Sequence, residues 1–158
     1  MIPKAKTIAV VEHQLKAARA WAERKEVTLD WGREDLELRA VLTHPQTGDK
    51  FYLRGRFDDY PALPPEWTFC SSDWEECGEN RFFPASNGSR YGSVMHTNGL
   101  ICAHFSRESF DEYGGPHSDW GSPAQWITQK DDTVYADTIG DMLGVIYRDL
   151  SQSKGRMG

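Results

Sequence analysis

The sequence predicts a single α+β domain in which a helix precedes an antiparallel meander and further helices follow a long irregular segment. Apolar residues recur at helical spacing near both ends of the chain, and four runs with strand-like alternation lie between residues 27 and 70. A chain of 158 residues suits one domain. We expect its core at residues 7–150 and a frayed tail at residues 151–158.

The first predicted helix covers residues 7–27. Steps of three and four place its apolar residues on one stripe, which consists of Ile8, Val11, Leu15, Ala18 and Ala22. Charged residues fall outside this stripe, and the hydroxyl of Thr7 suits an N-cap. The pattern therefore predicts an amphipathic helix with one face on the core.

The four predicted strands share alternation of apolar and polar residues, and they cover residues 27–31, 36–42, 51–57 and 66–70. The composition of residues 44–49 predicts a turn. Residues 58–65 include prolines, which lack a backbone donor, so this segment cannot continue a strand ladder. We therefore expect a four-stranded antiparallel meander that ends at a proline turn.

The second half begins with a segment, residues 71–121, that shows no periodicity. Irregular segments of this length are uncommon in compact domains unless they serve a function. Ser122 and Pro123 then suit the N-cap and first turn of a short helix that ends at Ile127. A last helix is predicted over residues 133–150, where one stripe contains Tyr135, Ile139, Met142, Ile146 and Leu150.

Bulk properties argue against several classes of protein. The net charge of −6 and the pI near 5.3 disfavour a general nucleic-acid binder, which usually carries a basic patch. No apolar run reaches membrane length, and charged residues interrupt the first apolar stretch too early for a signal peptide. Three cysteines cannot all pair, so we expect reduced thiols and a cytoplasmic protein.

One of these cysteines is placed like a nucleophile. Cys102 follows the apolar pair Leu100 and Ile101, and it precedes a polar, glycine-containing loop in the part of the chain richest in histidine. A cysteine after two apolar residues is otherwise most often a small buried hydrophobe. We interpret Cys70 and Cys77 as structural or incidental thiols.

Three motifs resemble those of ubiquitin-conjugating enzymes. Residues 60–69 are similar to that family's Y-P-x-x-P-P-x-x-x-F segment, and residues 98–102 are similar to its N-G-x-I-C run. Residues 120–124 resemble its W-S-P-A, with Gly121 inserted. The resemblance covers residues 7–150 and implies a ubiquitin-conjugating-enzyme fold. It also implies a transferase activity, in which Cys102 carries a thioester to the C-terminal glycine of a partner protein and passes that acyl group to an amine.

Two differences from the usual family pattern indicate which members of the family this chain resembles. The family's His-Pro-Asn triplet, whose Asn stabilises the oxyanion, is replaced by Gly92, Ser93 and Val94. The loop from Cys102 to Trp120 is longer than in typical eukaryotic members. Both traits resemble bacterial members encoded in antiphage defence operons. The implied partner is then a cGAS-like nucleotidyltransferase or a ubiquitin-like protein, which is either activated by a separate enzyme or already activated when it arrives.

The chemistry of acyl transfer indicates which side chains could help the thiol. An ordinary cysteine has a pKa of ~8.5, so a base is useful but not required for thioester exchange near neutral pH. Transfer to an amine also needs a donor for the developing oxyanion. In a locally extended chain His104 shares a side with Cys102, which makes it the first candidate. His96 and Asn98 are supporting candidates, and the loop offers His117 and Asp119.

Other functions compete with this hypothesis. A non-catalytic relative would use the fold only to bind a partner. A zinc site could use Cys102 with His104, His96 or His117, and Cys70 or Cys77 as a further ligand, although no paired C-x-x-C is present. A Cys-His hydrolase would release the acyl group to water. Apart from the zinc alternative, the sequence indicates no cofactor and no metal.

Overall fold

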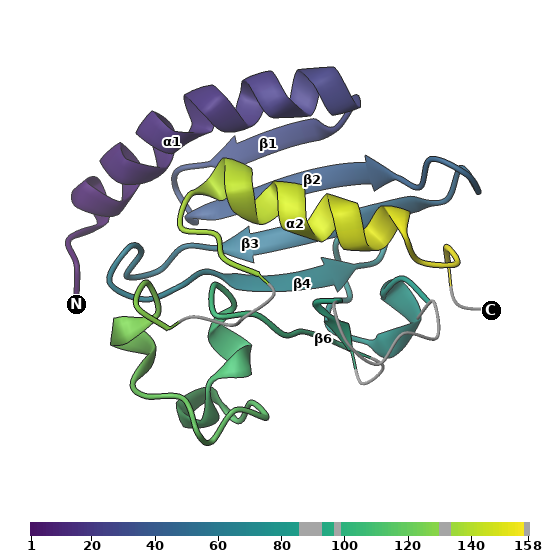
Figure 1. Cartoon of the computed structure of the whole chain (residues 1–158). Coiled ribbons are helices and arrows are strands. Elements are labelled where there is room, and N and C mark those ends of the chain that lie inside the picture. Colours follow the sequence, from purple (N-terminus) through teal and green to yellow (C-terminus); the bar gives the residue numbers. More distant parts are fainter. Residues whose placement is uncertain (86–92, 97–98, 130–133, 157–158) are drawn as a thin grey trace.

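The computed structural model describes residues 1–85, 93–96, 99–129 and 134–156. Its elements in chain order are α1 (Lys4–Lys25), β1 (Thr28–Gly32), β2 (Glu37–Thr43), β3 (Lys50–Arg56), β4 (Glu66–Cys70), β5 (Met95–His96), β6 (Leu100–Ile101) and α2 (Ile139–Ser151). Strands β1–β4 form an antiparallel sheet in chain order, and α2 crosses in front of it beside α1 (Figure 1). The predicted α+β class, the N-terminal helix, the meander and the C-terminal helix are confirmed.

The sheet is two-faced, as its alternation predicts. Leu38, Ala40 and Leu42 of β2 are buried on the face that carries the helices. Register pairs Ala40 with Leu53 of β3, which is also fully buried. Side chains of this face and of both helices form one core cluster, which buries enough apolar surface to hold the helices on the sheet.

The helix boundaries differ from the predicted ones because side chains found other partners. Helix α1 begins at Lys4, and Thr7 does not cap it but donates its hydroxyl to Tyr60 O (2.7 Å) from a buried position. Helix α2 begins at Ile139, where the hydroxyl of Thr138 accepts a hydrogen bond from the backbone N–H of Asp141. The predicted start at residue 133 lies outside the described residues.

Tyr135 and the short helix also differ from prediction. Tyr135 lies before α2 and is 47% exposed, so it does not belong to the apolar stripe. The short helix is a single 3₁₀ turn, η4 (Pro123–Gln125), in which Ser122 accepts from Ala124 N as the predicted N-cap.

The C-terminal tail was expected to fray, but residues 152–156 are hydrogen-bonded to the β2–β3 turn and to residue 85. His44 Nε2 contacts Ser153 O (2.8 Å), and Ala85 N donates to Gly155 O (2.7 Å). Arg156 N donates to Asp49 Oδ2 (2.8 Å). These bonds hold the tail as far as residue 156. Nδ1 of the buried His44 ring accepts from Gln46 N within the turn, so Nε2 donates to Ser153 O of the tail.

The expectation of three reduced cysteines is wrong. Cys70 and Cys77 form a disulfide, because the turn between them pairs Ser71 N with Glu76 O (2.7 Å) and returns the chain to the end of β4. Cys102 keeps its thiol. Among the described residues, no helix is both long enough and apolar enough to cross a membrane.

Candidate active site around Cys102

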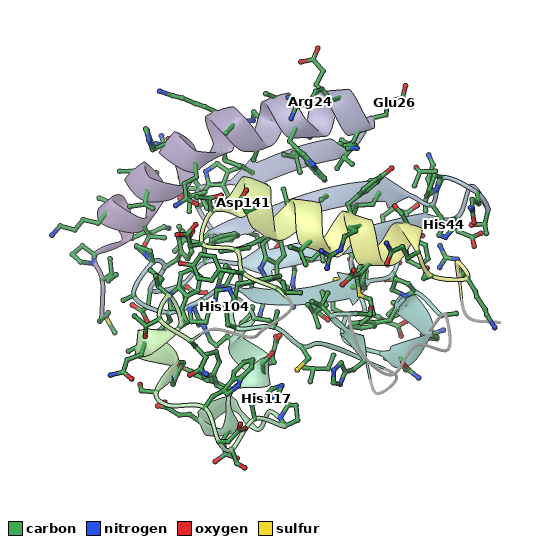
Figure 2. All side chains as sticks on the ribbon, in the orientation of Figure 1. Arg24, Glu26, His44, His104, His117 and Asp141 are labelled. Atoms are coloured by element: carbon green, nitrogen blue, oxygen red, sulfur yellow. A yellow bond between two sulfur atoms is a disulfide. The ribbon has the colours of Figure 1, made fainter. Side chains whose placement is uncertain are left out.

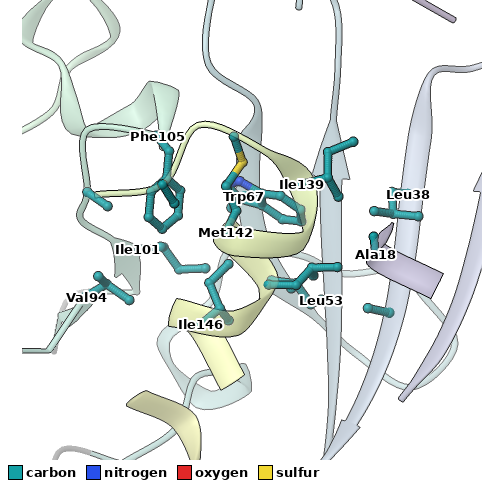
Figure 3. Close-up of a cluster of buried hydrophobic side chains, with 14 of the residues drawn as sticks. Ala18, Leu38, Leu53, Trp67, Val94, Ile101, Phe105, Ile139, Met142 and Ile146 are labelled. Carbon is teal, nitrogen blue, oxygen red and sulfur yellow. The ribbon is translucent and has the colours of Figure 1, made fainter. Parts of the chain in front are cut away.

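Cys102 lies at the edge of the core. It follows β6, and its backbone N–H donates to Val94 O (2.7 Å). Ile101 and Phe105 on either side are fully buried and point toward Met142 of α2 (Figure 3). Cys102 itself is 8% exposed, so the residue is largely buried at the edge of the core.

A buried arginine ties the segment after Cys102 to the proline turn. Residues 102–129, the site loop, include Arg107, whose Nε donates to Pro64 O (2.9 Å) and whose backbone N–H donates to Pro65 O (2.9 Å). Its guanidinium also contacts Asp58 O. Trp126 Nε1 donates to Pro61 O (2.9 Å). Carbonyls of the proline turn therefore fix both ends of the site loop.

The site loop then folds back on itself, in a stretch we name the return limb, residues 114–117. Gly114 has φ +79° and ends a short 3₁₀ turn, and Gly115 N donates to Phe110 O (2.9 Å). His117 N donates to Ser109 O (3.1 Å). A side chain at Gly115 would place Cβ 2.0 Å from Glu108 O, so only glycine permits this close approach of the two backbones.

This folding brings His117 to Cys102. His117 Nε2 lies 2.8 Å from Cys102 Sγ, although fifteen positions separate the residues. The other ring nitrogen, Nδ1, is 3.8 Å from Asp119 Oδ1, a contact weakened by the 81% exposure of the Asp119 side chain. The imidazole stacks on Trp120, with ring centroids 3.8 Å apart and an angle of 6° between planes. A thiol, an imidazole and a carboxylate thus stand in the order used by cysteine nucleophiles.

His104, the first candidate helper from sequence, has a different place. Residues 103–105 form a bend and a turn, so the extended geometry that favoured His104 does not occur. The ring is fully buried, with Nδ1 2.8 Å from Trp126 O and Nε2 accepting from Ala136 N (3.0 Å). Figure 2 shows His104 nearer the sheet and His117 out in the site loop. Because backbone groups engage both ring nitrogens, His104 serves to join the site loop to residues 134–138.

Of the two supporting candidates, His96 and Asn98, only His96 lies among the described residues. His96 is paired with Leu100 in the β5–β6 ladder, at the surface. Partial shielding from solvent and, secondly, the charge of His117 lower the pKa of His96, so its ring lies within the electrostatic reach of the site. Asn98 lies outside the described residues. The oxyanion donor therefore stays open, and a role for His96 or Asn98 stays a prediction.

A small cavity adjoins the site. It has a volume of about 300 Å³ and is lined by Gly99, Leu100, Glu108, Tyr113 and residues 114–116. Burial raises the pKa of Glu108 from 4.5 to about 7, and the neighbouring Glu66 adds to this rise. Neither the cavity nor Glu108 was indicated by the sequence, because both depend on how the return limb folds.

No metal cluster accompanies these groups. Within the described part of the chain, no set of three or more His, Cys, Asp or Glu side chains is placed to hold a metal ion. The zinc alternative therefore gains no support from the described contacts of Cys102 and His117.

A scan against protein-family models gave no match, and searches of curated proteins and of solved structures gave none either.

Proposed function

We propose that this protein is an acyl carrier of the ubiquitin-conjugating type, whose Cys102 holds the C-terminal glycine of a partner as a thioester and transfers it to an amine. The 2.8 Å contact between Cys102 Sγ and His117 Nε2 carries the proposal, because an adjacent histidine promotes the reactive thiolate. The order of helix, meander, cysteine segment and helix supports a conjugating enzyme over other thiol enzymes, as do the motifs at 60–69 and 120–124.

Loading requires one proton to move twice. His117 accepts the proton of the Cys102 thiol, and the thiolate attacks the carbonyl carbon of the partner's activated C-terminal glycine. The departing group, a thiolate of an activating enzyme, takes that proton from His117. In the second stage an amine attacks the new thioester, loses its proton to His117 and forms an amide, while Cys102 leaves as thiolate. Loading therefore leaves a neutral His117 that can accept the proton of the amine, and the second stage ends with the Cys102 thiolate beside the His117 imidazolium, ready for another loading step.

The partner we propose is a cGAS-like nucleotidyltransferase or a ubiquitin-like protein ending in glycine, in bacterial antiviral defence. Two features support this setting: the absence of a His-Pro-Asn triplet before Cys102 and the long site loop. The sequence contains no recognisable adenylate-forming nucleotide loop, so a separate protein supplies the activated donor.

Replacement of Cys102 by serine tests the proposal. Incubated with a candidate partner, its activating enzyme and ATP, Cys102→Ser should accumulate an oxyester that resists thiols, where the wild type gives a thioester that thiols cleave. Cys102→Ala is the matched control and should give no adduct. If no partner forms any adduct with the serine variant, and Cys102→Ala retains all biological function, the chain is a binding module instead.

The order Cys102, His117, Asp119 also favours a second candidate, a Cys-His hydrolase acting on the same conjugates. Water then replaces the amine in the second stage. The two activities differ in outcome, because a hydrolase releases the free partner from a purified conjugate without accumulating a thioester. A time course on a non-reducing gel distinguishes them.

A further inference from the structure

Ser109 hydrogen-bonds both to the residues on either side of Cys102 and to His117. It ends the 3₁₀ turn η2 (Arg107–Ser109) and is fully buried. Its hydroxyl accepts from Ala103 N (2.9 Å) and donates to Ile101 O (3.3 Å), so it bonds to both residues that flank Cys102.

The backbone of Ser109 bonds to the other partner of the site. Ser109 O accepts from His117 N at 3.1 Å. Ser109 therefore hydrogen-bonds to the backbone of both neighbours of Cys102 and to the backbone of His117 itself. A hydroxyl has one donor and two acceptor positions, which is sufficient for one donated and one accepted bond. Alanine would keep the bond to His117 and lose both bonds beside Cys102.

We propose that Ser109 is a positioning residue that sets the distance between the Cys102 thiol and the His117 imidazole. This inference rests on Cys102 acting as a nucleophile, as in the proposed function. Ser109 contacts neither the thiol nor any substrate, and it acts only through the two backbone segments that it joins. Without the hydroxyl, the Cys102 segment keeps its core anchors but loses both of its direct hydrogen bonds to the residue whose carbonyl accepts from His117 N.

The test measures the reactivity of the thiol and needs no partner protein. Iodoacetamide alkylation of the Cys102 peptide is followed by mass spectrometry from pH 5.5 to 9. In Ser109→Ala the rate near pH 6.5 should fall by about tenfold, since small misplacements of reacting groups have large effects on rate. The difference should shrink at high pH, where the thiol ionises without help from His117.

Ser106→Ala is the matched control. Ser106 is equally buried in the same loop, but its hydroxyl lies near Glu108 (3.4 Å) instead of bonding beside Cys102. Its alkylation profile should follow the wild type. Ser109→Thr keeps the hydroxyl and should recover most of the rate.

A double-mutant cycle separates positioning from a general loss of structure. In a His117→Ala background, Ser109→Ala should change the alkylation rate by less than about twofold, because the contact it adjusts is already gone. An equal fall in both backgrounds, no fall in either, or an equal fall in Ser106→Ala overturns the proposal.

Should the Ser109 variants fail to fold, a crystal structure of the wild type decides, and a Ser109 hydroxyl away from Ile101 O and Ala103 N refutes the proposal. An unchanged alkylation profile beside a normal Cys102→Ser oxyester rejects the role of Ser109 alone.

Discussion

The scaffold and the site loop are stabilised in different ways. The scaffold is formed by α1, β1–β4 and α2. Its stability is distributed over the hydrogen bonds of the strand ladders and the contacts of many buried apolar side chains. In the site loop, residues 102–129, Phe105 and Phe110 join the same core, but the path of the loop also depends on single side chains such as Arg107 and His104, which hydrogen-bond to backbone groups distant in the sequence. A ladder tolerates the loss of one bond, whereas a buried donor that loses its acceptor is left unsatisfied. Substitutions in the site loop should therefore disturb the thiol far more than equal substitutions in the scaffold.

Gly115→Ala should have the largest effect, because its Cβ would lie 2.0 Å from Glu108 O and 2.4 Å from Ser109 O. The free energy of unfolding should fall by about 3 kcal/mol, as expected for overpacking against backbone. Alkylation of Cys102 should fall as well, since the return limb that holds His117 must move. Urea unfolding and alkylation at neutral pH measure the two effects. A variant with wild-type stability would show that the return limb does not pack as described.

Removal of the disulfide should affect the scaffold alone. Cys70→Ser with Cys77→Ser should lower the free energy of unfolding by about 2 kcal/mol, because the bridge closes a short loop. The alkylation rate of Cys102 should stay within twofold of the wild type. A large fall in that rate would contradict the separation of the two regions. Urea unfolding with and without reductant provides the same comparison in the unmodified chain.

Glu108 should make the stability of the site loop depend on pH. Its pKa is raised from 4.5 to about 7 by burial and by Glu66, so the folded chain holds the proton more tightly than the unfolded chain. The contribution of protonated Glu108 to the stability of the folded chain is fully present below pH 4.5 and is lost as the pH rises through 7. Allowing for partial exposure, Glu108→Gln should remove about 1 kcal/mol of the difference in unfolding free energy between pH 5 and 8. The exposed Glu112→Gln serves as control and should leave the pH profile unchanged.

Gly144→Ala should have the smallest effect and the opposite sign. Gly144 lies inside α2, and the nearest atom to an added Cβ is Trp21 Nε1 at 3.9 Å, an ordinary contact. The gain in helix propensity should stabilise the protein by about 0.5–1 kcal/mol. Thermal unfolding measures this gain. A decrease would show that α2 packs more tightly on α1 than this spacing indicates.

The sequence predicts the scaffold well because its signals are local. Alternation over β1–β4 and the apolar stripes of α1 and α2 depend on neighbouring residues, so periodicity locates the strands and α1 to within three residues, whereas α2 begins six residues after its predicted start. The predictions are wrong at residues whose role depends on a partner far away in the sequence. Thr7 bonds to Tyr60 O instead of capping a helix, and Cys70 meets Cys77 only because the intervening turn closes.

The site is less predictable for the same reason. The motif around Cys102 selects the cysteine, and its contact with His117 gives that selection a chemical basis. His104 was favoured over His117 on the assumption of an extended chain, and the turn at residues 103–105 removes that assumption. Nothing in the sequence distinguishes Ser109 from Ser106. Their different bonds arise from the return limb, whose path depends on Gly114 and Gly115.

The unequal anchoring of the two reacting groups also has a thermal consequence. The cysteine follows Ile101 into the core, whereas the return limb that carries His117 is held chiefly by short-range backbone bonds to Phe110 and Ser109. Segments with few buried contacts open at lower free energy than the global transition. On warming, the base should detach while the core is intact, so thiol reactivity should decline reversibly below the melting temperature. Any reactivity that depends on the contact between Cys102 and His117 would then have an upper temperature limit set by the opening of the site loop, below the melting temperature of the fold.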